Sequence, residues 1–430
     1  KDFHDCWNVA PVRRKLRNLA SRMKYCKKSL LILTPRARVP DELRDDAVIL
    51  PLPPPSVVEL EQVLHHLTRT PGVTVDLTPS GREKLLQAAL GLSAAQAQRV
   101  FARAIVADGV LDDGDIDLVT EEKRQIIHES EALEFFPATK SIEDVGGLLS
   151  LKNWLRLRER AFTREAREYG LPAPRGIALI GIPGTGKSLV AKMIAGLWRL
   201  PLFRLDAGAL FGSLVGESEE RTRRALRLAE ATAPSLLWID EVEKALSHGG
   251  LDSGTSARVF ATVLTWMQEK TAPVFVVATA NDISRLPPEL LRKGRFDEIF
   301  FLDLPSQPER REILAVHLRR RKRDPEKYDL KQLSEQSEGY VGAELEQAIL
   351  DAMYVGFNEG REFTTQDVSH ALSQQVPLSV SQRETIDALR GWLREGRAQS
   401  ASITARGDSA LGLEKPSQLS AAGVSEGGGR

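Results

Sequence analysis

Three apolar runs stand out in the pattern of hydrophobic and polar positions, within residues 176–195, 235–241 and 274–281. Each is a short block of mostly aliphatic residues, which predicts a strand buried on both faces of a sheet. After the first run, a glycine-rich segment leads into apolar residues with helical spacing, so we expect strand, loop and helix in that order. Amphipathic spacing predicts two further helices, a basic one at 13–28 and another at 376–401.

Composition limits the class of protein. The chain has 430 residues, of which 42% are hydrophobic and 27% charged, so it is long enough for two or three compact, soluble units. Lys plus Arg (59) equals Asp plus Glu (59), so no net charge attracts it to nucleic acid or an anionic membrane. No apolar run is long enough for a membrane span, and the two cysteines, Cys6 and Cys26, fit a reducing compartment. Because the first residue is Lys1 rather than Met, we expect a fragment of a longer chain.

The glycine-rich segment has the spacing G-x4-G-K-[ST], which ends in Lys187 and Ser188. Between a strand and a helix, glycines let backbone N–H groups surround phosphate oxygens at the positive end of the helix. Lys187 would bring charge to the β and γ phosphates, and Ser188 would offer a hydroxyl to Mg2+. The motif predicts an ATP and Mg2+ site. The loop residues expected around the phosphates are Gly181, Pro183, Gly184, Thr185, Gly186, Lys187, Ser188 and Leu189.

Two adjacent carboxylates end the second apolar run, and an amide ends the third. Asp240 would hold Mg2+ through water, and Glu241 would polarise the attacking water. Asn281 follows its strand where a neutral donor could orient the same water, although an Asn in this place is ordinarily a turn former. The order of the three strands favours the catalytic interpretation.

Arg292 and Arg295 flank a glycine in the segment LLRKGRFDEIFFLDLP, residues 290–305. Arginines in a turn are ordinarily solvated surface charges. The alternative is an arginine finger that reaches the γ phosphate of a neighbouring subunit. The sequence leaves open which of the two would be the finger.

Further blocks, SIEDVGGLLSLKNWL, GESEERTRRAL, GRFD and GYVGAELEQAI, complete a resemblance to the AAA family of ATPases over about residues 140–375. The resemblance implies a P-loop α/β core, a parallel sheet flanked by helices, followed by a helical lid. ATP would lie between them, in a domain that forms homo-hexameric rings. The resemblance also places Asp144, Val145 and Gly146 near the adenine, and Gly342 and Ala343 in the lid near the nucleotide.

The resemblance also implies domain boundaries. We expect an ATP-binding subdomain at 141–306, a lid at 307–375, a C-terminal helix at 376–399 and a disordered tail at 400–430. More narrowly, phrases such as GESEERTRRALRLAE and PPELLRKGRFDEIFF resemble the AAA proteins that cyanobacterial and plastid genomes encode as hypothetical chloroplast reading frame forty-six. This implies a cytoplasmic protein, or a stromal one if it is plastid-encoded, with a role in photosynthetic physiology.

The N-terminal part repeats the back half of this core. Three segments match in the same order, which predicts a second, partial AAA-like domain made of strand, helix, strand and lid. The pairs are 30–43 with 274–290, 49–67 with 300–318, and 91–105 with 339–353.

This copy is assigned to residues 1–119, with a linker at 120–140 that is helical and then extended. Its catalytic residues are missing: Phe3 stands where Glu241 has a carboxylate, and no Asn follows Thr34 before Leu43. Its own P-loop would precede Lys1. The copy is therefore expected to be degenerate and kept for assembly, with a regulatory nucleotide site as the alternative.

Three classes of function remain open: a remodeller of protein substrates, a nucleic-acid-binding ATPase, and a nucleotide-gated scaffold. Leu214 occupies the place where ring motors of this family commonly carry an aromatic residue, which argues against threading of polypeptide. A Gly- and Ser-rich loop at 247–259 would touch substrate or be a plain surface connection. Basic runs at 13–28 and 318–323 keep nucleic acid as an alternative, because phosphate contacts need such charges.

Overall fold

The computed structural model describes residues 6–7, 9–34, 39–50, 52, 54–69, 71, 73–128, 133–136, 140–205, 217–246, 253–283, 286, 289–290, 292, 294–395 and 398–402. The chain divides into two compact units, Lys1–Ser56 and Val57–Arg430. Among the described helices, none is both long enough and apolar enough to cross a membrane.

A seven-stranded sheet forms the centre of the second unit, in the order β3-β5-β6-β7-β4-β8-β9. Its strands are β3 (Leu133–Phe136), β4 (Gly176–Gly181), β5 (Leu202–Leu205), β6 (Ser235–Ile239), β7 (Val274–Ala280), β8 (Glu298–Leu302) and β9 (Gln399–Ser400). All neighbours are parallel except β3 and β5. The strands β4, β6 and β7 are buried along their whole length, which explains their continuous apolar sequences.

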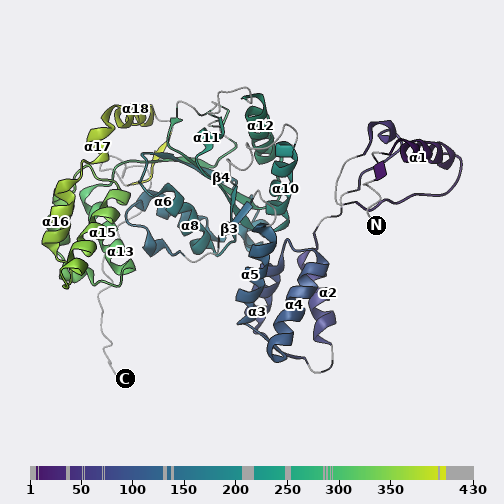
Figure 1. Ribbon diagram of the computed structural model, residues 1–430, viewed down its shortest axis with the longest axis horizontal. Coiled ribbons are helices and arrows are strands. Elements are labelled where there is room, and N and C mark those ends of the chain that lie inside the picture. The colour runs from purple at the N-terminus through teal and green to yellow at the C-terminus, as the bar shows by residue number, and fades with distance from the viewer. Residues whose placement is uncertain are drawn as a thin grey trace, which may run out of the picture. The chain divides into compact units, whose positions relative to one another are not determined.

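Helices cover both faces of the sheet (Figure 1). One face packs on Leu151 and Met193, and the other on Leu226 and Phe260. The elements on the first side are η3 (Ile142–Asp144), α6 (Leu149–Leu157), η4 (Glu159–Phe162), α7 (Arg164–Glu168) and α8 (Lys187–Trp198). Those on the second side are α10 (Glu217–Ala231), α11 (Val242–Leu246) and α12 (Ser253–Glu269). This layered α/β arrangement confirms the predicted fold class.

The lid follows β8 as a cluster of helices with a core of its own. It consists of α13 (Gln307–Arg320), η6 (Pro325–Lys327), α14 (Leu330–Gln336), α15 (Gly342–Asn358) and α16 (Thr365–Gln374). The rings of Tyr328 and Phe363 lie 5.0 Å apart inside it. At the start of the helix α13, the backbone N–H and the hydroxyl of Ser306 both donate to the Glu309 carboxylate, at 2.9 Å each.

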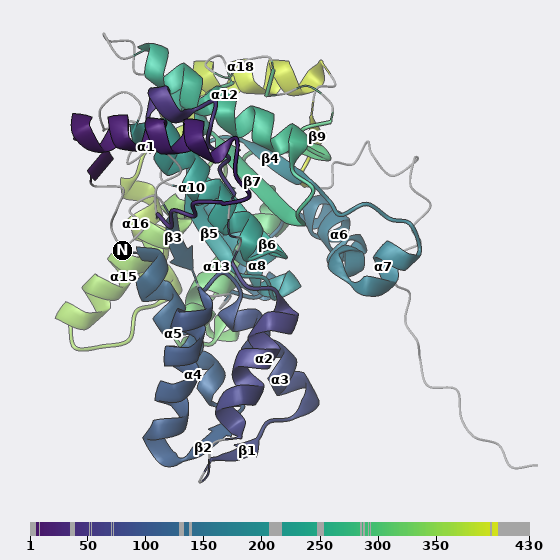
Figure 2. The same cartoon turned by 90° about the vertical axis from the view of Figure 1, so that its right-hand side faces the viewer.

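Four helices lie in the sequence between Val57, where the second unit begins, and the main sheet. They follow one another in the same order as the main helices of the lid. They are α2 (Val57–Thr68), α3 (Pro79–Ala89), α4 (Ala94–Asp108) and α5 (Asp115–His128), with a short parallel pair β1 (Thr74–Asp76) and β2 (Val110–Asp112). Figure 2 shows them side by side, with the strand pair at one end. By the internal repeat in the sequence, α2 corresponds to α13 and α4 to α15.

The linker predicted at 120–140 begins inside α5 rather than after it. The chain is helical and then extended, as expected, because β3 follows. This strand pairs antiparallel with β5 at the edge of the main sheet, Glu134 opposite Arg204. The connection between the helical repeat and the core is therefore part of the sheet, which the sequence did not indicate.

The first unit contains α1 (Ala10–Met23) and η2 (Asp41–Leu43). The ion pairs Arg13–Glu42 (2.9 Å) and Lys24–Asp46 (2.7 Å) join the helix to the segment around η2. The strands predicted near 30–34 and 48–52 are not formed in the described part of this unit. Leu31 is 80% exposed there and Leu50 76%.

The missing strands have a physical reason in the topology of the second unit. By the repeat, the two apolar segments fall on β7 and β8, and both of these strands pair with β4 rather than with each other. In the described part of the first unit, no strand takes the place of β4. An apolar segment without a paired neighbour cannot form a ladder, whatever its side-chain pattern. Asp2 and Phe3 lie outside the described residues.

The C-terminal helix predicted at 376–399 is divided in two, α17 (Leu378–Ser381) and α18 (Arg383–Arg394). Ser381 ends the first helix and Arg383 begins the second. After α18 the chain returns to the sheet, where the buried Ala401 donates from its N–H to Phe301 O (2.9 Å) and accepts from Leu151 N (3.1 Å). Residues 400–402 are therefore not part of a disordered tail as predicted, and 403–430 lie outside the described residues.

Candidate active site

The glycine-rich loop connects the end of β4 to the start of α8. Gly184 and Gly186 have φ angles of 77° and 94°, in the left-handed region that favours glycine. The Lys187 ammonium turns back into the loop, where it donates to the carbonyls of Gly181 (2.9 Å) and Ile182 (2.8 Å). Without a nucleotide, the Lys187 ammonium is thus bonded to carbonyls of its own loop. Bound phosphate oxygens would attract it away from these carbonyls.

Burial determines the protonation of Lys187. Removal from water lowers the pKa of its ammonium to about 8, although the nearby carboxylates Glu243, Asp240 and Glu241 act in the opposite direction. A group with this pKa is still mostly protonated at neutral pH. Binding of phosphate would stabilise its charge further.

The acidic edge lies beside the loop because β6 and β7 pair in register, Ile239 opposite Ala278. Thr279 then faces the first acid and donates from Oγ1 to Asp240 Oδ1 at 2.6 Å. The Ser188 hydroxyl lies 3.5 Å from the same oxygen. Thr279 also accepts from the backbone N–H of Glu241 (3.0 Å), so one threonine hydroxyl fixes both acids. Nothing in the sequence pattern indicated this role for Thr279.

Glu241 and Asn281 lie together, as their positions after adjacent strands predict. The Asn281 amide donates from Nδ2 to Glu241 Oε1 at 3.2 Å. The other carboxylate oxygen lies 2.6 Å from Lys244 Nζ. Glu241 has φ of 49°, a left-handed conformation that costs a non-glycine residue about 1 kcal/mol or more and is typical of functional sites.

The loop, the acidic edge and the lid enclose a cavity of about 560 Å3, a size suited to a nucleotide. Asp144, Val145 and Gly146 line it on one side and Gly342 and Ala343 on another. All the cofactor-binding residues expected from sequence line this cavity except Gly181, whose carbonyl holds Lys187. The loop and the lid touch directly, through Ala343 N and Gly184 O at 3.2 Å.

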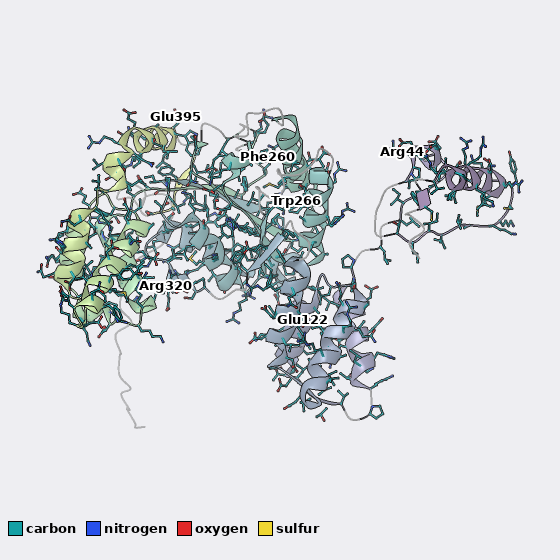
Figure 3. The ribbon with its side chains drawn as sticks, in the orientation of Figure 1. Arg44, Glu122, Phe260, Trp266, Arg320 and Glu395 are labelled. Carbon is teal, nitrogen blue, oxygen red and sulfur yellow. The ribbon has the colours of Figure 1, made fainter. Side chains whose placement is uncertain are left out.

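Lid side chains complete the cavity, and sequence reasoning missed them. They are Ile313, Val316, His317, Arg320 and Glu346. Burial lowers the pKa of His317, whose Nδ1 lies 3.4 Å from Glu346 Oε1. Arg320, labelled in Figure 3, lies at the carboxyl end of α13. Their helical spacing resembles that of core residues, so only the fold could place them at the site.

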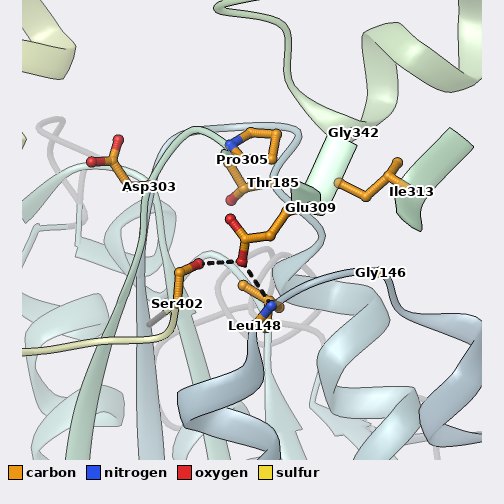
Figure 4. A pocket seen from close by; sticks show the side chains of 9 residues that line it. All are labelled: Gly146, Leu148, Thr185, Asp303, Pro305, Glu309, Ile313, Gly342 and Ser402. Carbon is orange, nitrogen blue, oxygen red and sulfur yellow. Dashed lines mark hydrogen bonds between the residues drawn. The ribbon is translucent and has the colours of Figure 1, made fainter. Parts of the chain in front are cut away.

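A much smaller pocket adjoins the cavity, with about 20 Å3 of space (Figure 4). Its Glu309 carboxylate accepts from Leu148 N (3.0 Å) and Ser402 Oγ (2.6 Å), and from Ser306 at the helix start. Burial by itself would raise the pKa of Glu309, but these hydrogen bonds outweigh it and hold the pKa below its ordinary value. The pocket is a structural joint between lid, core and C-terminal segment rather than a ligand site.

The two arginines differ in exposure. Arg292 is exposed, whereas Arg295 is only 9% exposed. Its Nε and Nη1 have no hydrogen-bond partner among the described residues. Neither side chain lines the nucleotide cavity of its own subunit.

The oxygen atoms at the acidic edge fit Mg2+. Within the described residues, no group of three or more His, Cys, Asp and Glu side chains could hold a metal by itself. Mg2+ is ordinarily held by one or two protein oxygens together with substrate phosphates, and Ser188 and Asp240 offer that pair beside the phosphate loop.

Family models match the chain in three segments. Residues 177–304 match the ATPase family associated with various cellular activities (AAA). Residues 58–130 match the second domain, and residues 1–52 the N-terminal domain, of SpoVK-like AAA ATPases.

Over nearly the whole chain, the sequence is 45% identical to the AAA domain-containing protein ycf46 of Pyropia yezoensis, across 94% of this chain and 82% of that protein. The chain belongs to the ycf46 group of AAA ATPases. The corresponding ycf46 protein of Guillardia theta is also 45% identical, across 94% of this chain and 80% of its own length. Across 50% of this chain, the sequence is 35% identical to the proteasome-activating nucleotidase of Aeropyrum pernix, of which 54% is covered.

The activity of this AAA protein is hydrolysis of ATP. The family match and the site agree in position, because the matched segment 177–304 contains the phosphate loop and both acids.

Proposed function

We propose that this AAA protein is a Mg2+-dependent, ring-forming ATPase that couples movement of its lid to the remodelling of a macromolecular substrate. The observation that carries the proposal is the direct contact between lid and phosphate loop, Ala343 N to Gly184 O. A nucleotide in the cavity would touch the sheet edge and the lid together. Loss of the γ phosphate would therefore change the contacts that hold α15 against the core.

Each site residue has a proposed role. Lys187 binds the β and γ phosphates, and Ser188 and Asp240 hold Mg2+, which neutralises charge on those phosphates when bound. Glu241 accepts a proton from the attacking water, and Asn281 orients that water. The left-handed Glu241 is held in place by Thr279 and Lys244, so its carboxylate is positioned before substrate arrives.

The ring is proposed because neither Arg292 nor Arg295 lines the cavity of its own subunit, although the lid residue Arg320 does. Arg292 is the better candidate for the finger, because a residue that reaches a neighbour's phosphate has to be exposed. Arg295 is proposed to support the turn from inside. Turnover per subunit should rise with protein concentration. Arg292→Ala should lower ATP turnover about 10³-fold while ATP still binds.

Mixing two inactive variants tests the ring directly. Arg292→Ala keeps an intact phosphate loop and Lys187→Met keeps an intact Arg292. If the site is completed between subunits, an equal mixture regains roughly a quarter of wild-type turnover, since one interface in four combines the two intact parts. A mixture as inactive as its components, with ring assembly verified, would contradict the finger. Arg295→Lys is mixed in the same way as a second variant. The lysine is used because Arg295→Ala could unfold the turn in which Arg295 is buried.

The substrate class stays a proposal. Leu214 and residues 247–252 lie outside the described residues. The rest of the loop predicted at 247–259 is wrong, because residues 253–259 are the start of α12. A nucleic-acid-binding ATPase, through the basic ends at 13–28 and 318–323, and a gated scaffold are the alternatives. A pull-down with the Glu241→Gln form in ATP separates the three classes by retention of protein, RNA or neither.

The N-terminal part is proposed to be a degenerate AAA-like domain kept for assembly. The lid-like order of α2 to α5 supports this proposal. The ycf46 relatives support a setting in the cytoplasm or plastid stroma of photosynthetic cells.

A further inference from the structure

Arg204 lies on β5, between the edge strand β3 and the strand that carries the acids. Glu134 is its partner in the antiparallel pair, and Trp238 its neighbour in the parallel pair. Side chains at matched positions of adjacent strands point to the same face. Glu134, Arg204 and Trp238 therefore form one row across the sheet, which ends beside Asp240.

The Arg204 guanidinium divides its contacts between two carboxylates. Nη2 lies 3.3 Å from Asp240 Oδ2, and Nη1 lies 3.4 Å from Glu134 Oε2. Its Cζ lies 5.1 Å from the centre of the Trp238 ring, so the aromatic face supports the side chain. About a third of the side chain is exposed, which leaves it room to move along the row.

Asp240 is the carboxylate proposed to hold Mg2+, and its two oxygens have different partners. Oδ1 accepts from Thr279 and faces Ser188, whereas Oδ2 faces Arg204. A fixed cation at Oδ2 neutralises the carboxylate in the nucleotide-free site. The same cation repels a divalent ion that approaches Oδ1, so Arg204 and Mg2+ compete for one negative charge.

We propose that Arg204 is a positioning residue that holds Asp240 while the site is empty and moves to Glu134 when Mg2+ binds. Glu134 belongs to β3, the strand through which the helical repeat α2 to α5 joins the ATPase core. The strength of the pair between Glu134 and Arg204 then sets the metal affinity of the site. By reciprocity, metal binding draws β3 more firmly onto β5. This inference rests on the proposed role of Asp240 in holding Mg2+.

The test measures metal affinity rather than turnover. In a Glu241→Gln background, which prevents hydrolysis, binding of a fluorescent ADP analogue is titrated with Mg2+, and Mn2+ binding is followed by electron paramagnetic resonance. Arg204→Met keeps the apolar stem on Trp238 and removes the charge, so the apparent dissociation constant for the metal should fall about three- to tenfold. Glu134→Gln should raise it about threefold, because Arg204 then stays on Asp240.

A double variant separates the relay from simple long-range charge. In Arg204→Met, the further change Glu134→Gln should have no effect on the metal affinity. An effect as large as in the wild type would mean that Glu134 acts by its own charge, and the relay would be wrong. Arg323→Met is the matched control, because Arg323 pairs with Glu362 in the lid at similar exposure, and it should leave metal affinity unchanged.

The outcomes also distinguish this inference from the function on which it rests. Binding of the nucleotide in the presence of EDTA should be equal in all variants, which verifies that each is folded. If metal affects nucleotide binding in the background protein but Arg204→Met does not tighten it, the inference fails and the proposed metal site stands. If metal has no effect in any form, the metal site fails and the inference with it.

Discussion

The side-chain amide of Asn281 donates a hydrogen bond of 3.2 Å to Oε1 of Glu241. The bond joins the ends of two adjacent strands, and Lys244 holds the second oxygen of the same carboxylate at 2.6 Å. The amide has a second N–H that remains available for a water molecule. Under the proposed mechanism, this pair would hold the water that attacks the γ phosphate, which leads to the first prediction.

Replacement of Asn281 by Ala should reduce ATP turnover by about 10²-fold, because the water loses one of its orienting donors. The affinity for ATP should hardly change, since the phosphate loop is untouched. Steady-state turnover and nucleotide binding measured side by side check this. Asn153→Ala is the matched control, because the half-buried Asn153 accepts from Arg156 within α6 and does not line the cavity. Equal turnover in both variants would contradict the role of Asn281.

Nucleotide affinity should fall as the pH rises above about 8. Burial lowers the pKa of Lys187 to about 8 in the empty site, and only the protonated ammonium attracts phosphate. Below that pH the affinity should be nearly constant, and above it each molecule of ADP bound should take up a proton. Calorimetry at pH 8.5 in buffers of different ionisation enthalpy measures that uptake. Absence of any proton uptake would show that Lys187 is already charged throughout.

Lys123 on α5 should make the protein more stable as the pH rises. It is 2% exposed, and burial lowers the pKa of its amine to about 7 from 10.5. Between these values the unfolded chain binds more protons than the folded one, so the free energy of unfolding increases with pH. Lys123→Met should stabilise the protein at pH 7 by roughly 2 kcal/mol and remove this slope. Urea denaturation at pH 7 and 9 measures both effects. The exposed Lys331→Met should change neither.

Glu309→Gln should loosen the lid. The amide cannot accept from all the donors that meet the carboxylate, so the cost should be about 1–3 kcal/mol of folding free energy. The hydrogen bonds of Glu309 hold its pKa below the ordinary 4.5, so its contribution is present above that pH and is lost as the pH falls through the lowered value. Denaturation between pH 3 and 7 measures the difference. The exposed Glu326→Gln is the control. An equally small loss of folding free energy in both variants would contradict the role of Glu309 in holding the lid to the core.

The sequence predicted the part of the site that lies in short motifs at the ends of buried strands. The phosphate loop follows from glycine spacing between a strand and a helix, and Asp240, Glu241 and Asn281 follow from the rule that parallel strands present their ends at one edge. His317 and Glu346 could not be found this way. They belong to lid helices whose spacing is that of ordinary core residues, and only the fold of α13 and α15 brings them to the cavity.

The prediction of strands in the first unit was wrong for a different reason. Their apolar pattern is as strong as that of β7, but a strand needs a neighbour as well as a pattern. The sequence predicted an extended segment here but not its pairing with β5, because the four residues of β3, LEFF, are too short to show the period of a strand. The break between α17 and α18 is marked by no Pro or Gly, so nothing in the sequence indicated it.

The strand β9 also has a consequence for how the protein is made. It pairs with β8, its neighbour Ala401 bonds to Leu151 at the start of α6, and Ser402 bonds to Glu309. On the ribosome, the whole lid must be synthesised before this segment emerges. The first helix of the ATPase core therefore waits for one of the last described segments before its contacts are complete. A nascent chain halted within the lid would hold a phosphate loop but an unfinished sheet edge, which makes that interval of translation the one in which a chaperone would be needed most.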